Sequence, residues 1–269
     1  MNDTEINEDF DPKRYWEQRL TNAYTLGSVG WSGLGESFNR WMYAVRKRVF
    51  RRVVRESIDD LSDLRVLDVG SGTGFYLNAW QELGVRDLSG SDLTSVALTG
   101  LCAVFEDMPI HQLDIGGSPE QLPDDRYDVV SIMDVLYHIV DDQRYTQALH
   151  NLSRLVKPGG KLILSENCVA QTQIGIHQVS RSRIQIEDVL REAQLIPVLQ
   201  RPMFFLMNSP IDSNSRILHR WWSTVVKLSA RNEVLGWSLG AAVFPLELAL
   251  VRLASTGPSS KIIVCQREA

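Results

Sequence analysis

A glycine-rich turn behind an apolar run is the strongest chemical signal in the sequence. Residues 66–74 read VLDVGSGTG, which is an apolar run, an acid and then glycines at alternate positions. Such glycines let the backbone turn sharply and approach a ligand, at the sheet edge where open α/β folds bind ligands. A GxGxxG dinucleotide pattern is incomplete because Phe75 stands three residues after Gly72, and no GK[ST] ending supplies a Walker phosphate loop.

Two more acids follow the glycine turn, each at the end of a predicted strand. Asp92 lies 20 residues beyond Gly72, where a carboxylate can accept hydrogen bonds from both hydroxyls of a ribose. Asp114 comes after the next strand and precedes Ile115, so this pair can hold an exocyclic amine and cover an adenine ring. A turn cap is the alternative role for Asp114. The agreement of turn and acid spacing favours a bound ligand over purely structural turns.

These side chains need a parallel sheet to bring them to one edge. After Leu64, short apolar runs alternate with helical patterns, which is typical of βα units wound into a parallel sheet. The predicted strands are residues 64–69, 88–91, 110–113, 127–134, 161–165, 195–205 and 261–266. The predicted helices of this part are residues 75–83, 94–105, 143–155 and 185–193. Residues 158–161, PGGK, are expected to form the turn into the fifth strand.

The N-terminal part of the chain predicts a basic amphipathic helix. Between residues 39 and 57, apolar side chains such as Met42, Val45 and Val49 recur at helical spacing, while Arg and Lys occupy much of the remaining surface. A solvated face is the first interpretation of these charges. A site for an anionic lipid or a substrate phosphate is the alternative.

The late part of the chain predicts a helical insertion. Residues 234–254 carry few charges, and this stretch is broken by Pro245 and has Glu247 near its middle. A charge at that position would be expensive inside a bilayer, so we do not expect a transmembrane span. The insertion is predicted to be a buried helical hairpin or cap. A surface that makes weak contact with a membrane or accepts a lipid tail is the alternative.

Five segments between residues 60 and 205 carry a family resemblance: VLDVGSGTG, SGSDLT, HQLDIG, YDVVSIMDVLYHI and LVKPGGKLILSE. Together they resemble the motifs of class I S-adenosylmethionine-dependent methyltransferases. The resemblance implies an α/β fold with a Rossmann-like, doubly wound sheet of seven strands, six parallel and the last antiparallel. It also implies an N-terminal helical lid at residues 1–60, a cofactor-binding core at 61–208 plus 257–269, and a helical substrate cap at 209–256, before the last strand.

The resemblance assigns a role to each strand-end residue. Asp68 and the glycine turn would hold the methionine portion of S-adenosylmethionine, and Asp92 would hold the ribose. Asp114 with Ile115 would frame the adenine. Asp134 would line the pocket floor, with a helix N-cap as its alternative role. The predicted cofactor-binding residues are Asp68, Gly70, Ser71, Gly72, Asp92, Leu93, Asp114, Ile115, Met133 and Arg19.

Histidines near the expected pocket are candidates for catalysis. A sulfonium methyl is already electrophilic, so transfer needs mainly a nucleophile held in line. A hydroxyl acceptor must also lose its proton, and an imidazole is suited to take it. His138, after the fourth strand, and His177, after the fifth, are the candidate general bases, and a structural role is the alternative for both. No acid cluster at the strand ends indicates a metal, so transfer without metal is expected.

The N-terminal segment resembles the lid helices that fold over the cofactor in this family. Arg19 is predicted to meet the methionine carboxylate. Trp16 or Trp31 is predicted to stack against the sulfonium by cation–π attraction. Hydrophobic packing onto the sheet is the alternative for both tryptophans.

Charge and cysteine content narrow the classes of partner and compartment. The formal net charge of −5 gives no reason to expect attraction to nucleic acid. Three widely spaced cysteines, Cys102, Cys168 and Cys265, form no CxxC pair, which disfavours a disulfide framework or a zinc site. The acidic N-terminus lacks the basic and apolar regions of a signal peptide, so a cytoplasmic protein is expected. The oligomeric state is left open.

The sequence therefore predicts a methyltransferase that uses S-adenosylmethionine, releases S-adenosylhomocysteine and acts on a small molecule. The expected target is a hydroxyl of a natural product, a sugar or a lipid-linked intermediate, since the aromatic and apolar insertion favours an apolar acceptor. A noncatalytic S-adenosylmethionine-binding scaffold or partner subunit is the main alternative. A nicotinamide-dependent oxidoreductase is disfavoured by Phe75.

Overall fold

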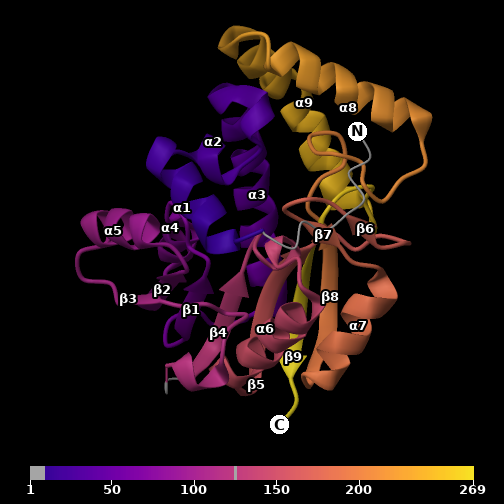
Figure 1. Cartoon of the computed structure of the whole chain (residues 1–269). Helices are drawn as coiled ribbons and strands as arrows, with labels where there is room; N and C mark the ends of the chain where they lie inside the picture. The colour runs from indigo at the N-terminus through magenta and orange to yellow at the C-terminus, as the bar shows by residue number, and fades with distance from the viewer. Residues whose placement is uncertain (1–9, 124–125) are drawn as a thin grey trace.

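A seven-stranded sheet forms the centre of the computed structural model, which describes residues 10–123 and 126–269 (Figure 1). The strand order is β3-β2-β1-β4-β5-β9-β8. Strand β9 runs antiparallel to both of its neighbours, and the remaining pairs are parallel, which confirms the predicted doubly wound fold with a reversed last strand. The strands are β1 (Arg65–Val69), β2 (Asp87–Asp92), β3 (Ile110–Gln112), β4 (Tyr127–Ile132), β5 (Val156–Glu166), β8 (Leu195–Pro202) and β9 (Lys261–Arg267).

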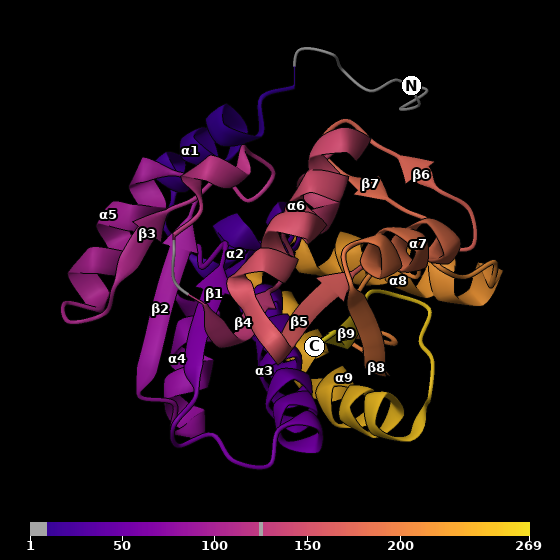
Figure 2. The ribbon, with the colours of Figure 1, turned by 90° about the horizontal axis from the view of Figure 1, so that it is seen from below.

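Helices cover both faces of this sheet, as Figure 2 shows. They are α1 (Pro12–Asn22), α2 (Leu26–Val29), α3 (Gly35–Ser57), α4 (Phe75–Leu83), α5 (Ser95–Val104), α6 (Asp142–Leu155), α7 (Arg183–Glu192), α8 (Arg216–Ser229) and α9 (Glu233–Leu253), with 3-10 turns η1 (Ser32–Leu34), η2 (Pro119–Gln121) and η3 (Leu136–His138). One hydrophobic core lies between the sheet and helices α3, α4 and α5. A second core lies beneath α6 and α7. The central strands are therefore buried on both faces, which is why they read as continuous apolar runs.

Two features of the β5 region differ from the sequence prediction. The PGGK segment at 158–161 lies inside β5 rather than ahead of it, and the pairing of β4 with β5 shifts register between Tyr127 and Val129. Gly159 has φ +75°, a conformation that glycine adopts without strain, so the irregular start can still pair. The loop after β5 also contains a small ribbon of β6 (Gln173–Ile174) and β7 (Val179–Ser180), which is too short to show a strand pattern in sequence.

The basic helix α3 is only partly solvated. Lys47 and Arg51 both pair with Glu82 of α4, at 2.5 and 3.4 Å. Arg46 is 7% exposed and lies inside the protein. Arg48 remains exposed. The basic face is therefore solvated at Arg48 and Arg55 but not at Arg46, because this helix is packed between α4 and the late insertion.

The insertion before β9 is helical, as predicted, and consists of α8 and α9, which pack on each other and on α3. Helix α9 continues through Pro245, so the predicted break does not occur. Glu247 is buried, and its carboxylate accepts hydrogen bonds from the backbone N–H groups of Phe205 and Leu206, at 2.6 Å each. Within the described residues, α9 is long and apolar enough to cross a membrane by length and composition alone, a test that core helices also pass.

Candidate active site

A cavity lies at the carboxyl ends of β1, β2 and β4, beneath the N-terminal helices. Its wall includes Pro12, Trp16 and Leu20 of α1 and Val29 of α2, so the N-terminal segment covers it as a lid. The sequence-predicted residues that line the cavity are Gly70, Ser71, Gly72, Asp92, Leu93, Asp114, Ile115, Met133, Asp134 and His138. Parallel strands end at the same edge, which is why residues so far apart in sequence meet here.

The glycine turn adopts backbone angles that only glycine reaches without strain. Gly70 and Gly72 have φ +72° and +54°. A Cβ atom on Gly70 would lie 2.4 Å from Cγ2 of Val135, so no side chain fits there. The N–H groups of Gly70 and Ser71 both donate to the carbonyl of Ser91, at 2.8 Å each, and hold the turn against β2.

Asp92 stands beside this turn with its carboxylate partly committed. Oδ2 accepts from the Gly72 N–H, and Oδ1 accepts from the backbone N–H and hydroxyl of Thr94, each at 2.9 Å. A carboxylate offers about four acceptor positions, so one position on Oδ2 remains for a ribose hydroxyl. Burial raises the pKa of Asp92 above its ordinary value. A ligand hydroxyl that donates to Asp92 would offset this cost of burying the charge.

Asp68 lies under the turn rather than on the cavity wall. It is 1% exposed, and its Oδ1 accepts a 2.6 Å hydrogen bond from the Ser131 hydroxyl. Burial raises the pKa of Asp68 to about 7. Two polar groups that do belong to the wall, the Thr73 hydroxyl and the Tyr76 hydroxyl, are buried without a hydrogen-bond partner among the described residues. Groups of this kind favour a polar ligand such as the amino acid end of S-adenosylmethionine.

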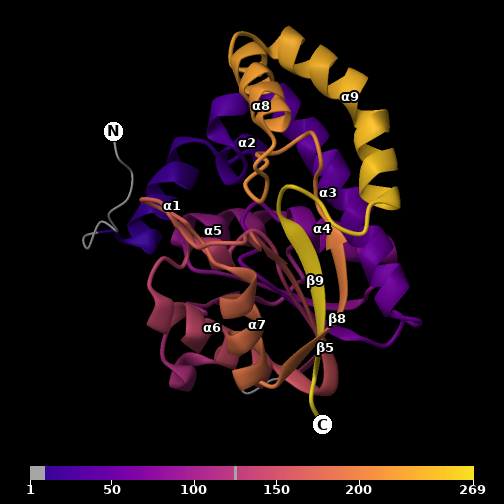
Figure 3. The ribbon, with the colours of Figure 1, turned by 90° about the vertical axis from the view of Figure 1, so that its right-hand side faces the viewer.

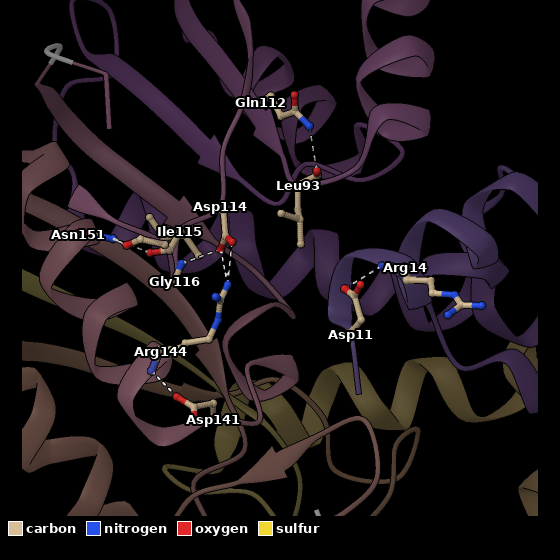
Figure 4. A network of polar contacts seen from close by, with 11 residues as sticks. Asp11, Arg14, Leu93, Gln112, Asp114, Ile115, Gly116, Asp141, Arg144 and Asn151 are labelled. Atoms are coloured by element: carbon tan, nitrogen blue, oxygen red, sulfur yellow. Dashed lines mark hydrogen bonds and ion pairs between the residues drawn. The ribbon is translucent and has the colours of Figure 1, made fainter. Parts of the chain in front are cut away.

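Asp114 lines the cavity and is held by Arg144 (Figure 4). Its two carboxylate oxygens accept from Nη2 of Arg144, at 2.9 and 2.7 Å, and Oδ1 also accepts from the Gly116 N–H at 3.2 Å. Asp114 thus caps its own turn and lines the cavity at the same time. Ile115 and Leu93 add apolar surface beside it. This mixture of apolar and hydrogen-bonding groups suits an adenine ring.

A buried ion pair that the sequence interpretation did not anticipate borders the cavity. Nε of Arg46 lies 2.7 Å from Oδ2 of Asp134. Asp134 has φ +60°, and its Oδ1 also accepts from the hydroxyls of Ser165 and Tyr137, at 3.1 and 3.2 Å. Helix α6 is capped by Asp141 instead, so Asp134 is not its N-cap. The sequence did contain a signal, since Arg46 falls on the apolar face of its helix, where a charge needs a partner.

His138 lies on the cavity wall with one ring nitrogen already engaged. Its Nδ1 is 2.9 Å from the carbonyl oxygen of His177. Because a carbonyl oxygen can only accept a hydrogen bond, Nδ1 carries the hydrogen, and Nε2 of the neutral ring is left as an acceptor. Burial lowers the pKa of His138 to about 4 and also lowers the pKa of His177. The His177 side chain is not part of the wall and stacks on Tyr15 at 5.5 Å between ring centroids. Trp16 meets His138 edge-on at 4.9 Å.

The lid is fastened by contacts of its own. Arg19 donates to the carbonyl of Gly30 at 2.7 Å and is not part of the cavity wall, so its predicted contact with the cofactor carboxylate stays a prediction. The Tyr24 hydroxyl donates to the carbonyl of Gly72 at 2.8 Å and ties the lid to the glycine turn. Trp31 packs against Trp222 of α8, while Trp16 alone of the two predicted tryptophans faces the cavity.

The residues of the cavity fit S-adenosylmethionine. Asp92 has an acceptor position for the ribose, and the Asp114 end suits the adenine. The glycine turn, which no side chain fills, and the unpartnered hydroxyls suit the methionine portion. No group of three or more His, Cys, Asp or Glu that could hold a metal occurs within residues 10–123 and 126–269, and metal-free transfer stays a prediction.

A doubly wound sheet with a reversed last strand, a glycine turn after β1 and an acid after β2 together define a class I S-adenosylmethionine-dependent methyltransferase. Comparison with known families agrees. Residues 38–223 match the family described as a methyltransferase domain, and the chain belongs to this family.

Two bacterial methyltransferases are similar to this chain at low sequence identity. The chain is 28% identical over 189 residues to the ubiquinone biosynthesis O-methyltransferase of Xanthomonas oryzae pv. oryzae, covering 65% of this chain and 74% of that protein. It is 29% identical over 171 residues to the tRNA U34 carboxymethyltransferase of Idiomarina loihiensis, covering 60% of this chain. The chain spans about half the length of that second relative, since the match covers 51% of it.

Solved structures show the same fold at still lower identity. The magnesium protoporphyrin IX methyltransferase from Synechocystis PCC 6803, solved with bound S-adenosylmethionine, matches 98% of this chain and 100% of its own, with a TM-score of 0.58 and 15% identity. The N-methyltransferase NodS from Bradyrhizobium japonicum WM9 matches 97% of this chain and 100% of its own, with a TM-score of 0.57 and 12% identity. At such identities the likeness concerns the fold alone.

Proposed function

We propose that this chain transfers the methyl group of S-adenosylmethionine to a hydroxyl of a small molecule with an apolar or aromatic body. The observation that carries the proposal is His138, a cavity-wall imidazole whose Nδ1 is held by the His177 carbonyl. Its Nε2 is thereby kept as a proton acceptor. S-adenosylmethionine, when bound, supplies an electrophilic methyl group.

The chain's own residues then position the acceptor and take its proton. The proton on a hydroxyl oxygen becomes strongly acidic as that oxygen bonds to the methyl group. Even an imidazole with a pKa of about 4 can therefore remove this proton late in the reaction. Low basicity also keeps His138 neutral at pH 7, ready to accept. The lid, with Trp16 on the cavity wall and Tyr24 bonded to the Gly72 carbonyl, would shield the reacting atoms from water.

The apolar character of the acceptor follows from the wall on the lid side. Trp16, Leu20 and Val29 of the lid line the same cavity as Met133 and Val135. Polar sugars would leave their hydroxyls without partners against such a surface. The name of the Xanthomonas relative, an O-methyltransferase of ubiquinone biosynthesis, supports the same type of target atom.

A second candidate comes from the Idiomarina relative, which is named a tRNA U34 carboxymethyltransferase. By analogy, this chain would act on a tRNA. The net charge of −5 argues against it, because binding of nucleic acid depends on neutralising phosphates with Lys and Arg. We therefore rank the small-molecule acceptor first. A cytoplasmic location accompanies the proposal, supported by three free cysteines.

Release of S-adenosylhomocysteine tests the proposal. The purified chain would be incubated with S-adenosylmethionine and, in turn, an apolar phenol, a free sugar, a lipid-linked sugar and bulk tRNA. We expect turnover with the phenol or the lipid-linked acceptor, and a loss of at least about 100-fold in kcat for His138→Gln. His150→Gln, a change on α6 away from the cavity, is the matched control. Turnover with tRNA alone would contradict the small-molecule proposal.

Measuring S-adenosylmethionine binding distinguishes two reasons for a lack of turnover: a noncatalytic scaffold that binds the cofactor, or a cofactor site that is wrongly assigned. Asp92→Asn is expected to weaken binding of S-adenosylmethionine, measured by isothermal titration, because its side-chain nitrogen cannot accept a hydrogen bond. A chain that binds the cofactor tightly through Asp92 and turns over no acceptor would be a scaffold. Undiminished binding by a folded Asp92→Asn variant would mean that the site itself is misassigned.

A further inference from the structure

The turn between α8 and α9 exposes a cluster of large apolar side chains. We call residues 227–237 the hairpin tip. Its exposed apolar members are Leu228, Val234, Leu235 and Trp237, at 37%, 74%, 38% and 56% exposure. Single exposed apolar residues need no explanation, whereas a cluster of them within eleven positions marks an interaction surface.

The hairpin tip projects from the body of the protein and is held firmly. Figures 1 and 3 both place it at the end of the molecule opposite the C-terminus. The Glu233 carboxylate accepts from the N–H groups of Glu36 and Ser37, at 3.1 and 2.7 Å, which fastens the tip to the start of α3. The Trp237 ring lies 5.9 Å from the ring of Trp41, also on α3. The exposed apolar groups are therefore presented by a supported structure.

Two basic residues of the tip, Lys227 and Arg231, flank the apolar cluster, and its acid, Glu233, is held by the backbone of α3. Residues 216–231 contain four basic residues and no acidic ones, in a chain whose net charge is −5. These four basic side chains, all exposed, are Arg216, Arg220, Lys227 and Arg231. The start of α3 adds the exposed Arg40, which lies close enough to Glu233 to lower the pKa of that carboxyl. This arrangement complements a surface that is apolar within and negatively charged outside.

We propose that the hairpin tip docks on the surface of a bilayer that contains anionic phospholipid. Val234, Leu235 and Trp237 enter the headgroup region, where tryptophan is favoured because its ring is apolar and its N–H is polar. Lys227 and Arg231 contact the lipid phosphates. The apolar surface continues along α9 through Leu246 and Leu253, at 55% and 84% exposure.

A second copy of the chain fits this surface less well than a bilayer does. A two-fold dimer that buries this patch would bring the Lys227 and Arg231 side chains of both copies into one interface. Such like-charged contacts oppose association. An anionic bilayer attracts all of these cations at once. The charge distribution therefore decides between the two occupants.

Vesicle sedimentation with the 269-residue chain tests the proposal without cofactor or acceptor, so its result is independent of the methyl-transfer reaction. Vesicles of phosphatidylcholine alone would be compared with vesicles that also contain phosphatidylglycerol. We expect binding to the anionic vesicles that weakens as salt increases. The double variants Val234→Glu/Trp237→Glu and Lys227→Glu/Arg231→Glu should each bind at least about tenfold more weakly.

Matched controls carry the same substitutions elsewhere on the surface. Ile184→Glu on α7, where the native side chain is 72% exposed, and Arg154→Glu on α6 should bind vesicles like the unaltered chain. Circular dichroism would confirm that each variant is folded. The proposal is overturned by absence of vesicle binding, by equal binding to neutral vesicles, or by tip variants that bind as well as the controls. A dimer in solution that Val234→Glu disrupts, without vesicle binding, would assign the tip to a second copy instead.

Discussion

Replacing Arg46 with methionine is expected to destabilise the protein strongly, because the change leaves the Asp134 carboxylate charged and nearly buried. The two side chains are 8% and 14% exposed, and their ion pair is 2.7 Å long. Removing one member of a buried pair costs about 3–5 kcal/mol. Ser165 and Tyr137 still donate to Asp134 in the variant, which favours the lower end of that range.

The loss of two cation–π contacts adds to the destabilisation expected for Arg46→Met. The Arg46 guanidinium lies 4.9 Å from the ring centroids of both Tyr43 and Phe204. Each such contact is worth about 0.5–1 kcal/mol or more when desolvated. Together with the unpaired carboxylate, these contacts predict a loss of about 4 kcal/mol for Arg46→Met. Methionine keeps much of the stem of the side chain, so a large cavity does not contribute.

Urea unfolding followed by circular dichroism would measure this loss. Asp134→Asn should also destabilise, because it leaves Arg46 without its counter-charge, and the double variant should lose less than the sum of the single losses. Lys47→Met is the matched control on the same helix, since its pair with Glu82 is 35% and 43% exposed and should be worth about 1 kcal/mol or less. A loss below about 1 kcal/mol for Arg46→Met, or strict additivity in the double variant, would refute the reasoning.

Three further predictions concern the site. Gly70→Ala should weaken S-adenosylmethionine binding by more than about tenfold in isothermal titration, because its Cβ would strike Val135 and strain the turn, whereas Gly84→Ala, strained at φ +98° but with no atom within 4 Å, should keep its affinity. Equal affinity losses in the two variants would point to general destabilisation. With His138 as base, kcat should fall only as pH approaches about 4, and a break near 6.5 would contradict the burial of this imidazole. The pKa of Asp68 is about 7 in the folded state and 3.8 in the unfolded state, so the folded state binds more protons between these two values. The contribution of protonated Asp68 to folding stability is therefore lost as pH rises through the folded-state pKa. Asp68→Asn should therefore gain stability relative to the unaltered chain between pH 5 and 8 in urea unfolding, and a difference independent of pH would show that Asp68 does not titrate there.

Much of the fold and half of the site follow from local sequence patterns. The run before Asp68 predicts a buried strand, and the glycines that follow predict a turn with positive φ, because both depend only on neighbouring residues. Asp92 and Asp114 could be placed at the same edge for a simple reason: parallel strands all end there. The position of Arg19 could not be read from the sequence in the same way, since its hydrogen bond to the Gly30 carbonyl depends on how the N-terminal helices pack.

What the sequence by itself determined, then, is the order of strands and helices, the glycine turn and the acids at the strand ends that line the cavity. These are properties of segments shorter than about 20 residues, in which periodicity and turn chemistry act directly. Only the tertiary structure decided that Arg46 meets Asp134, that Tyr24 fastens the lid to Gly72, and which nitrogen of His138 is free. These contacts join residues 39 to 88 positions apart, and their formation depends on how whole helices pack on the sheet.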